Sequence, residues 1–252
     1  MSIEAAIADA LQLSDLRPNA QTNLVLTNLV ESIVLNQDAS RIKQFKKHTI
    51  NKIRKISSNS ETEMEIYWSK RISESKSPHD EMKKFPYIDN YIELTQRELE
   101  LVRLSGLSLN QKSQVLVIGS GPLPLSAIEL NRQTDAKISQ VDNSGPAINL
   151  SQKLCESIGM RTKYYLNSVQ DVKLKKDYDL ILIAALAGDS TKAKQKILDN
   201  VLPNLSQNGR IILRSAIGMR ELLYPGIKAD RLKHVKKLVE YHPQDYVITS
   251  VY

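Results

Sequence analysis

The sequence predicts an α/β protein in which an all-α helical bundle precedes a doubly wound domain with a parallel sheet. Residues 1–110 contain a single glycine, Gly106, and their apolar residues recur at spacings of three and four, which is typical of amphipathic helices. From residue 111 onward, short apolar runs alternate with helical stretches, as in strands joined by crossover helices. We therefore expect two domains, residues 1–110 and residues 111–252.

Four segments mark the expected elements of the helical half. Ser-Asp at 14–15 and Ser-Pro at 77–78 predict helix starts, because serine oxygens cap free amides and proline fits the first helical turn. Ser-Ser-Asn-Ser at 57–60 predicts a loop between helices. Residues 41–55 carry basic side chains without an acid, interleaved with apolar ones, and predict one amphipathic helix with a solvated basic face.

The second half alternates between expected strands and helices. Buried parallel strands are predicted where apolar runs are too continuous for half-exposed strands, at residues 115–118, 138–141, 180–185 and 211–213. Crossover helices are predicted between them, at residues 122–132, 146–158 and 191–201. Two further strands are expected to complete the domain, within residues 232–241 and 247–252.

The composition excludes several classes of protein. Cys155 is the only cysteine, so a disulfide scaffold is excluded, and the four scattered histidines show no metal-ligand spacing, so we expect no metal. The longest apolar stretch, residues 180–187, is far shorter than the ~20 residues that span a bilayer, and the first residues are acidic, unlike a signal peptide. We therefore expect a cytoplasmic protein without membrane contact, and leave a homo-oligomer open.

The net charge of +7 raises the question of an anionic partner such as nucleic acid. The strongest basic segment, residues 41–55, has no aromatic base-stacking platform and matches no recognised binding module. We therefore expect small-molecule substrates rather than nucleic acid.

A glycine-containing loop follows the first predicted strand and opens a helix. Its residues are Gly119, Ser120, Gly121 and Pro122. Two glycines let the backbone approach a ligand closely, and the helix start presents free amides. Pro124 stands where a dinucleotide fingerprint has its third glycine. On the glycines alone, a structural turn explains this loop as well as a ligand site does.

Asp142 and Asn143 strengthen the case for a bound nucleoside. They end the second predicted strand about 20 residues after the loop, where an acidic side chain accepts hydrogen bonds from ribose hydroxyls. The alternative is that Asp142 caps the helix that begins near Pro146. Because the third glycine is missing and two strands close the domain, the order of elements favours S-adenosylmethionine over a nicotinamide cofactor.

Five ordered stretches over residues 65–252 resemble the nicotianamine synthase family. They are Ile-Gly-Ser-Gly-Pro-Leu-Pro-Leu-Ser at 118–126, Phe-Pro-Tyr-Ile-Asp-Asn-Tyr at 85–91 followed by Glu98, Ala-Ala-Leu-Ala at 184–187, Arg-Ser-Ala-Ile-Gly-Met-Arg at 214–220 leading into Leu-Tyr-Pro at 223–225, and Tyr-His-Pro at 241–243 with Ser-Val at 250–251. His242 reads as a turn residue rather than a base. The resemblance implies that Ala184 and Ala185 join the cofactor loop at the S-adenosylmethionine site.

The resemblance implies an enzyme that uses S-adenosylmethionine as donor of its 2-aminobutyrate arm. An amine attacks the γ-carbon of that arm and methylthioadenosine leaves; repetition with one ring closure to an azetidine yields the metallophore nicotianamine. One alternative is a single transfer to histidine, as in staphylopine-type opine metallophores. A second is an RNA methyltransferase, although the chain has Ala-Ala-Leu-Ala at 184–187 where an Asn-Pro-Pro-Tyr motif would be expected. A third is a vestigial, non-catalytic module.

The reaction needs a group that deprotonates an amine and a group that orients it, because a sulfonium is already an activated leaving group. The resemblance implies that Glu65, which lies 26 residues before Tyr91, is the catalytic glutamate and that Tyr91 is the catalytic tyrosine. From the residues alone, Glu65 beside Glu61 and Glu63 reads as a surface charge. Tyr87 and Tyr91 likewise read as the edge of an amphipathic helix.

The expected substrate-binding residues are Tyr87, Glu98, Arg214, Arg220 and Tyr224. Guanidinium groups bind carboxylates in a bidentate fork, and the donor arm and the acceptors all carry carboxylates. Arg220 is the preferred carboxylate binder, with compensation of Glu221 as the alternative. Glu98 is expected to be either structural or a binder of the substrate amine.

Overall fold

The computed structural model describes residues 1–36, 38–166, 173–174, 177–241 and 248–251 of the 252-residue chain. Within these ranges a seven-stranded sheet has the order β3-β2-β1-β4-β5-β7-β6. Its strands are β1 (Gln114–Ile118), β2 (Lys137–Asp142), β3 (Lys163–Leu166), β4 (Tyr178–Ile183), β5 (Leu205–Ser215), β6 (Val239–Tyr241) and β7 (Ile248–Val251).

The sheet reverses its order of connection between β1 and β4. Strands β1 to β5 are parallel, whereas β7 runs antiparallel between β5 and β6. The chain extends outward from β1 to β3 and then returns to the other side of β1 with β4. At the carboxyl end of β1, Ile118 lies opposite Val141 of β2 and Ile183 of β4. This switch point is where open α/β sheets bind ligands.

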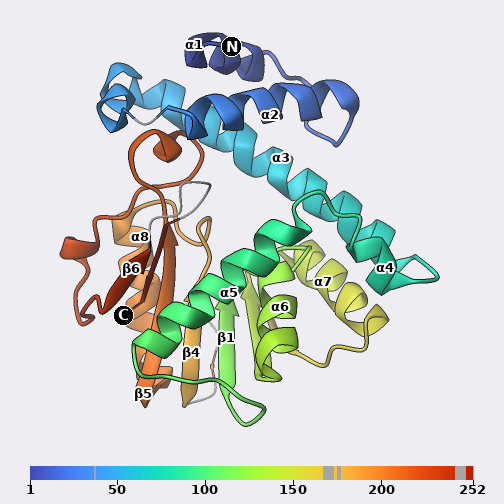
Figure 1. The fold of residues 1–252 in the computed structure, drawn as a ribbon, viewed down its shortest axis with the longest axis vertical. Helices are drawn as coiled ribbons and strands as arrows, with labels where there is room; N and C mark the ends of the chain where they lie inside the picture. Colours follow the sequence, from blue (N-terminus) through green and yellow to red (C-terminus); the bar gives the residue numbers. More distant parts are fainter. Residues whose placement is uncertain (37, 167–172, 175–176, 242–247, 252) are drawn as a thin grey trace.

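The helices before the sheet are α1 (Ile3–Leu11), α2 (Ala20–Val34), α3 (Lys47–Ser73), α4 (Pro78–Met82) and α5 (Ile88–Leu104). Those within the sheet half are α6 (Leu125–Thr134), α7 (Gly145–Ser157) and α8 (Thr191–Val201). Short 3₁₀ helices are η1 (Ala39–Gln44), η2 (Leu202–Asn204), η3 (Gly218–Leu222) and η4 (Ala229–Arg231). Figure 1 shows α1 and α2 farthest from the sheet, with α3 running from them to α7 and α5 crossing the front of the sheet.

Both faces of the sheet are covered, because alternate residues of a strand point to opposite sides. Val115 and Val117 of β1 pack in a core with α5, α6 and α7. Leu116 and Ile118 pack in a second core with α8. The doubly wound, Rossmann-like arrangement predicted from the sequence is therefore confirmed.

The helical half shares part of its core with the sheet. Ile72 of α3, Phe85 just before α5 and Leu101 of α5 belong to the same buried cluster as Val115. A separate cluster joins α1, α2 and the start of α3 with η3, through residues such as Leu29 and Leu222. Strands begin only at residue 114, close to the expected change at 110. The division into a bundle domain and a cofactor domain stays a prediction.

Most predicted elements of the second half occur where expected. The helix predicted at 191–201 coincides with α8, and the two closing strands are β7 and β6. Strand β5 begins six residues before the predicted run at 211–213. Strand β3 was missed, because Lys163–Leu166 is only half-buried and lacks a continuous apolar run. His242 and Tyr252 lie outside the described residues.

Three predictions in the helical half are wrong, and one of them is the helix start at residues 14–15, because α2 begins at Ala20. Residues 57–60 are not a loop but part of α3, where the Ser58 hydroxyl donates to the carbonyl of Lys55 and Ser60 is buried. Tertiary packing overrides the weak helix propensity of these serines. Residues 41–55 are not one helix, because η1 ends before Phe45, which is extended, and α3 begins at Lys47. Phe45 instead packs against the core of α1 and α2.

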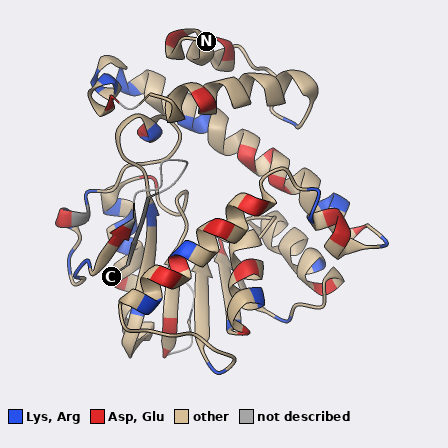
Figure 2. Ribbon diagram, in the orientation of Figure 1, with Lys and Arg blue, Asp and Glu red and all other residues tan. Residues whose placement is uncertain are grey.

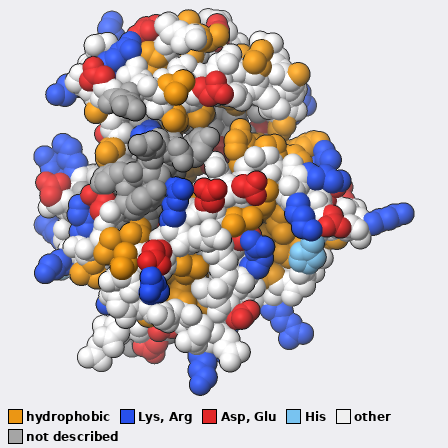
Figure 3. All heavy atoms as spheres, in the orientation of Figure 1, with side chains coloured by type: hydrophobic (Ala, Val, Ile, Leu, Met, Phe, Trp, Pro, Cys, Tyr) orange, Lys and Arg blue, Asp and Glu red, His pale blue; other side chains and the backbone are white. Residues whose placement is uncertain are grey.

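Charges of both signs are distributed over the molecule. Figure 2 shows both acidic and basic residues along α5. Figure 3 shows Lys and Arg side chains interspersed with Asp and Glu on the face in view, rather than joined into one basic track. Within the described ranges, none of the helices has the length and apolar character that a bilayer span requires.

Candidate active site

A cavity of ≈ 720 Å³ lies at the switch point of the sheet. It is bounded by the carboxyl ends of β1, β2 and β4 and by α2, α3 and α5. This volume is within the range of sites that enclose most of a small ligand. The cavity brings together every residue expected at the S-adenosylmethionine site, namely Gly119, Ser120, Gly121, Pro122, Asp142, Asn143, Ala184 and Ala185.

The two loop glycines are required by close contacts and by backbone conformation. Gly119 and Gly121 have φ values of +76° and +67°, a region that side-chain-bearing residues rarely adopt. A Cβ at Gly119 would lie 2.9 Å from the Cβ of Ala187. A Cβ at Gly121 would lie 2.6 Å from Oε2 of Glu65. The missing side chains therefore let the loop lie directly against the β4 loop and against Glu65.

Gly121→Ala is expected to lower both stability and turnover. The left-handed conformation costs an alanine roughly 1–2 kcal/mol, and the added methyl group displaces the Glu65 carboxylate. Thermal unfolding and the rate of methylthioadenosine release measure the two effects. Gly159→Ala is a matched control, because Gly159 also has a positive φ (+73°) but no atom lies within 4 Å of its Cβ position. Loss of turnover in both variants would contradict a specific role for Gly121.

Asp142 holds the glycine loop in place. Its Oδ2 accepts a hydrogen bond from the Gly121 amide at 2.9 Å, and its Oδ1 accepts one from the Ser144 amide at 2.9 Å. The cap of α7 is Ser144 rather than Asp142, because the Ser144 hydroxyl accepts from the Ala147 amide. An ionised carboxylate has about four acceptor positions, so Asp142 retains capacity for ribose hydroxyls. The hydroxyl of Ser120 is buried without a hydrogen-bond partner among the described residues.

Lys194 of α8 positions the loop after β4 and was missed by the sequence reasoning. Its Nζ donates to the carbonyl oxygens of Ala184 (2.5 Å) and Ala185 (3.2 Å), and the residue is fully buried. Burial, with a smaller effect of the Arg214 charge, lowers the pKa of Lys194 to about 7. The spacing contained a signal, because Lys194 shares the buried face of α8 with Leu198 and Val201, four and seven residues later.

Lys194→Met is expected to weaken S-adenosylmethionine binding. Methionine fills a similar volume but leaves the buried Ala185 carbonyl without the Lys194 donor, at a cost of about 1–3 kcal/mol. It also removes one of the two donors of the Ala184 carbonyl, which keeps the Ala187 amide, so the β4 loop loosens. Calorimetric titration with S-adenosylmethionine measures the affinity. Lys196→Met, an exposed change on the same helix, is the control. Equal affinity in wild type and Lys194→Met would refute the positioning role.

Two carboxylates of α3 face the cavity. Glu61 and Glu65 are four residues apart and so lie on one helical face, and both line the cavity. Burial raises the pKa of Glu65 well above its usual value, and the nearby charges of Glu61 and Asp142 raise it further. Burial also raises the pKa of Glu61 to about 7, although a hydrogen bond from Tyr224 and the Arg214 charge oppose this shift. Glu61 was missed as a site residue; its spacing from Glu65 was the available signal.

Three tyrosines line the same cavity. The Tyr224 hydroxyl donates to Oε2 of Glu61 at 3.2 Å. Burial raises the pKa of Tyr91, and the charges of Glu65 and Glu61 raise it further, so its hydroxyl stays a hydrogen-bond donor at neutral pH. Tyr87 is 39% exposed and packs edge-on against Phe85, with ring centroids 5.7 Å apart. Tyr91 therefore faces the acidic pair, whereas Tyr87 lies nearer the solvent.

Arg214 lines the cavity but directs most of its donors at protein groups. Its Nε and Nη2 each lie 2.8 Å from the Glu98 carboxylate, and its Nη1 donates to the Ser126 hydroxyl at 2.8 Å. Burial would lower the pKa of Arg214, but the charge and hydrogen bonds of Glu98 raise it overall. Glu98 and Arg220 are not among the residues that line the cavity. Glu98 therefore holds Arg214 from outside the cavity, and of the two arginines Arg214 rather than Arg220 reaches the cavity.

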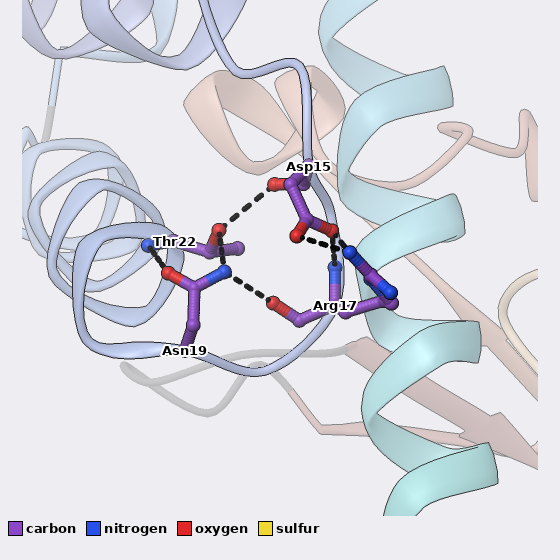
Figure 4. A network of polar contacts seen from close by, with 4 residues as sticks. All are labelled: Asp15, Arg17, Asn19 and Thr22. Atoms are coloured by element: carbon purple, nitrogen blue, oxygen red, sulfur yellow. Dashed lines mark hydrogen bonds and ion pairs between the residues drawn. The ribbon is translucent and has the colours of Figure 1, made fainter.

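The segment between α1 and α2 forms one wall of the cavity. Asn19 caps α2 by accepting from the Thr22 amide at 2.9 Å, and the Thr22 hydroxyl donates to the Asp15 carbonyl at 2.8 Å (Figure 4). Asp15 also forms an ion pair with Arg17 at 2.8 Å. The helix start predicted at residues 14–15 is therefore not present, because Asp15 lies in a turn before α2, which begins at Ala20. Two apolar residues of the segment line the cavity, Leu16 and Pro18.

The fold and the site together define a Rossmann-like enzyme that uses S-adenosylmethionine. Among the described residues, no three His, Cys, Asp or Glu side chains gather in a way that could hold a metal ion. A family model described as nicotianamine synthase protein matches residues 1–252. The chain belongs to the nicotianamine synthase family.

Relatives and solved structures agree with this assignment. Nicotianamine synthase of Solanum lycopersicum is 30% identical over 252 residues, which cover 95% of this chain and 78% of the relative. Nicotianamine synthase 9 of Hordeum vulgare is 28% identical over 95% of this chain and 73% of its own. A glutamate-to-glutamine mutant of MtNAS in complex with S-adenosylmethionine has a TM-score of 0.83 at 23% identity, over 99% of this chain and 95% of that one. MtNAS in complex with MTA and tNA has a TM-score of 0.82 at 21% identity, over the same shares. The structural likeness shows the shared fold.

Proposed function

We propose that the chain transfers the 2-aminobutyrate group of S-adenosylmethionine onto an amine, releases methylthioadenosine and forms nicotianamine or a closely related metallophore. One observation carries the proposal: the Glu65 carboxylate lies directly against the glycine loop, so close that a Cβ on Gly121 would be 2.6 Å from its Oε2. A proton acceptor thus lies next to the place where the sulfonium and its arm would bind. The family assignment supports the same reaction.

The proposed reaction is a substitution at the γ-carbon of the donor arm, in which a carbon–nitrogen bond forms and the carbon–sulfur bond breaks. The acceptor ammonium first gives a proton to Glu65, because an amine attacks only through a free lone pair. The nitrogen then attacks the γ-carbon, and the carbon–sulfur bond breaks with its electrons going to sulfur. Tyr91 donates a hydrogen bond that orients the acceptor, and alignment of nitrogen, carbon and sulfur avoids methyl transfer.

The donor is proposed to bind at the switch point. Asp142 would accept hydrogen bonds from the ribose hydroxyls, and Asn143, Ser120 and Pro122 border the same space. Ala184 and Ala185, whose carbonyls Lys194 fixes, would line the adenine side. Arg214 places positive charge at the cavity wall near the substrate carboxylates.

The electrostatics of the cavity favour a cationic substrate. Two carboxylates with raised pKa values, Glu61 and Glu65, share one helical face, and positive charge entering between them would relieve their mutual repulsion. Methylation of RNA is not supported by the mixed charges on the face in Figure 3. A single transfer to histidine uses the same chemistry, but the family model and the relatives are those of nicotianamine synthases.

The decisive experiment is product analysis by mass spectrometry after incubation with S-adenosylmethionine alone and then with added amino acids. Methylthioadenosine together with nicotianamine supports the proposal. Methylthioadenosine that forms only when histidine is present would replace it with the single-transfer alternative. S-adenosylhomocysteine as the sole nucleoside product would refute both. A metallophore product, a cytoplasmic location and a homo-oligomer stay predictions.

A further inference from the structure

We propose that Glu61 is a second catalytic base of this site, which takes the proton that stays on the acceptor nitrogen after the carbon–nitrogen bond has formed, so that this nitrogen can react again. The inference rests on the proposed function. It assigns the two carboxylates of α3 to two different proton transfers, Glu65 before the attack and Glu61 after it.

The proton balance of the reaction calls for two acceptors. An ammonium and a sulfonium react to give a neutral secondary amine, neutral methylthioadenosine and two protons. The first proton leaves before the attack, and the second stays on the nitrogen as a secondary ammonium. A secondary ammonium has no lone pair, so it cannot attack another carbon until this second proton leaves. In the ring closure to an azetidine one nitrogen forms a bond twice, and the second proton must therefore be removed inside the cavity.

The geometry places Glu61 in the same cavity as Glu65. Glu61 lies one helical turn before Glu65 on the same face of α3, and both residues line the cavity. In the part of the chain that the structure describes, neither carboxylate forms an ion pair. The charge of Arg214, which lines the cavity, acts on Glu61. Arg214 nevertheless forms its bidentate ion pair with Glu98.

Structural carboxylates of this protein are held differently. Glu98 is buried and receives both arms of the Arg214 fork. Glu129 is 2% exposed and accepts from Arg132 at 2.7 Å and from Gln133 at 3.1 Å. Glu61 has a single tyrosine hydroxyl, from Tyr224 at 3.2 Å. A carboxylate with one neutral donor keeps most of its acceptor positions for a ligand, which a purely structural carboxylate does not need.

The surroundings of Glu61 suit a base that works near neutral pH. The titratable and charged groups that act on it or respond to its charge are Glu65 of the same helix, Tyr91 of α5, Arg214 of β5 and Tyr224 after η3. Burial raises the pKa of Glu61 to about 7, whereas the Tyr224 hydrogen bond and the Arg214 charge favour its ionised form. A base with a pKa near the working pH combines availability with proton affinity.

Glu61→Gln is the primary test, read out as the distribution of products. We expect methylthioadenosine to be released and a single-transfer adduct to accumulate, while formation of the final multi-transfer product falls by about 10²-fold, the usual contribution of a general base. Glu63→Gln is the matched control, because Glu63 is two residues away on α3 but does not line the cavity. Circular dichroism and thermal unfolding establish that both variants are folded.

Three outcomes would overturn the inference or separate it from the proposed function. Wild-type amounts of the final product from Glu61→Gln would remove Glu61 from the chemistry. Loss of the first methylthioadenosine release in a folded Glu61→Gln protein would show that Glu61 acts before or during the first attack, contrary to its assignment. Failure of the wild type to release methylthioadenosine would instead refute the proposed function itself.

Tyr224→Phe provides a second test in which the Glu61 carboxylate is retained. The Tyr224 hydroxyl lowers the pKa of Glu61, so its removal raises that pKa. Because Glu61 must be ionised to accept a proton, formation of the final product rises with pH through the pKa of Glu61 in the wild type, and the rise should move to higher pH in Tyr224→Phe. The rise for the first methylthioadenosine release should move less. An unmoved pH profile for the final product would contradict the assignment even if Glu61→Gln did not fold.

Discussion

Glu65→Gln is expected to lower the rate of methylthioadenosine release by about 10²–10⁴-fold, while the protein still binds S-adenosylmethionine. A glutamine amide cannot accept the proton of the acceptor ammonium, so the nitrogen keeps no free lone pair. The change adds no volume, and the glutamine side chain would fit the same space against Gly121, where the loop approaches most closely. The loss should therefore appear in turnover and not in the architecture of the donor site.

Single-turnover assays of methylthioadenosine and calorimetric titration with S-adenosylmethionine separate the two effects of Glu65→Gln. The Glu63→Gln variant is again the control, because it removes one negative charge from the same helix outside the cavity. A Glu65→Gln protein that turns over at the wild-type rate would take the first proton transfer away from Glu65. A protein that loses donor binding would instead assign Glu65 to holding the cation.

The protonation state of Glu65 depends on whether a cation lies beside it. Burial, together with the charges of Glu61 and Asp142, favours the protonated acid. A sulfonium or ammonium beside it favours the carboxylate, because opposite charge stabilises the ionised form. Binding of the cationic substrate therefore favours the ionised Glu65 carboxylate, which is the form that can accept a proton. The same logic explains why the site needs no permanent cation at Glu65.

The sequence predicted those parts of the fold that depend on local patterns. Strand β1 was predicted from its continuous apolar run, which the structure buries over residues 115–118, and helix α8 from its position between two such runs. The prediction of a loop at residues 57–60 was wrong because it followed the serine-rich composition, whereas packing of α3 against its neighbours makes these residues helical. Strand β3 was not predicted because a half-buried edge strand has little apolar periodicity in its sequence.

The site was predictable where it lies in short motifs. The glycine loop and Asp142 follow from their order along the chain, and the structure brings them together by the Gly121–Asp142 hydrogen bond. The pairing of Arg214 with Glu98 was not predictable, since 116 residues separate the two and each reads alone as a substrate binder. The spacing of Lys194 with Leu198 and Val201 places it on the buried face of α8, but its hydrogen bonds to the β4 loop are tertiary contacts that this spacing does not specify.

Glu98→Ala is expected to lower the free energy of unfolding by about 3–5 kcal/mol, the cost of leaving one partner of a buried ion pair uncompensated. Glu98 is completely buried and Arg214 is 6% exposed, so bulk solvent screens neither charge effectively. The pair also joins α5 to β5, so its loss weakens the contact between the helices and the sheet. Denaturant unfolding measures the change.

The chain offers a matched control and a rescue for Glu98→Ala. Glu100 lies on the same helix and pairs with Arg103 at 2.6 Å, but both side chains are more than half exposed, so Glu100→Ala should leave the unfolding midpoint close to that of the wild type. Glu98→Leu combined with Arg214→Met should recover much of the stability, because no buried charge is then left unpaired. If the double variant is as unstable as Glu98→Ala, the lost stability belongs to packing rather than to the unpaired guanidinium.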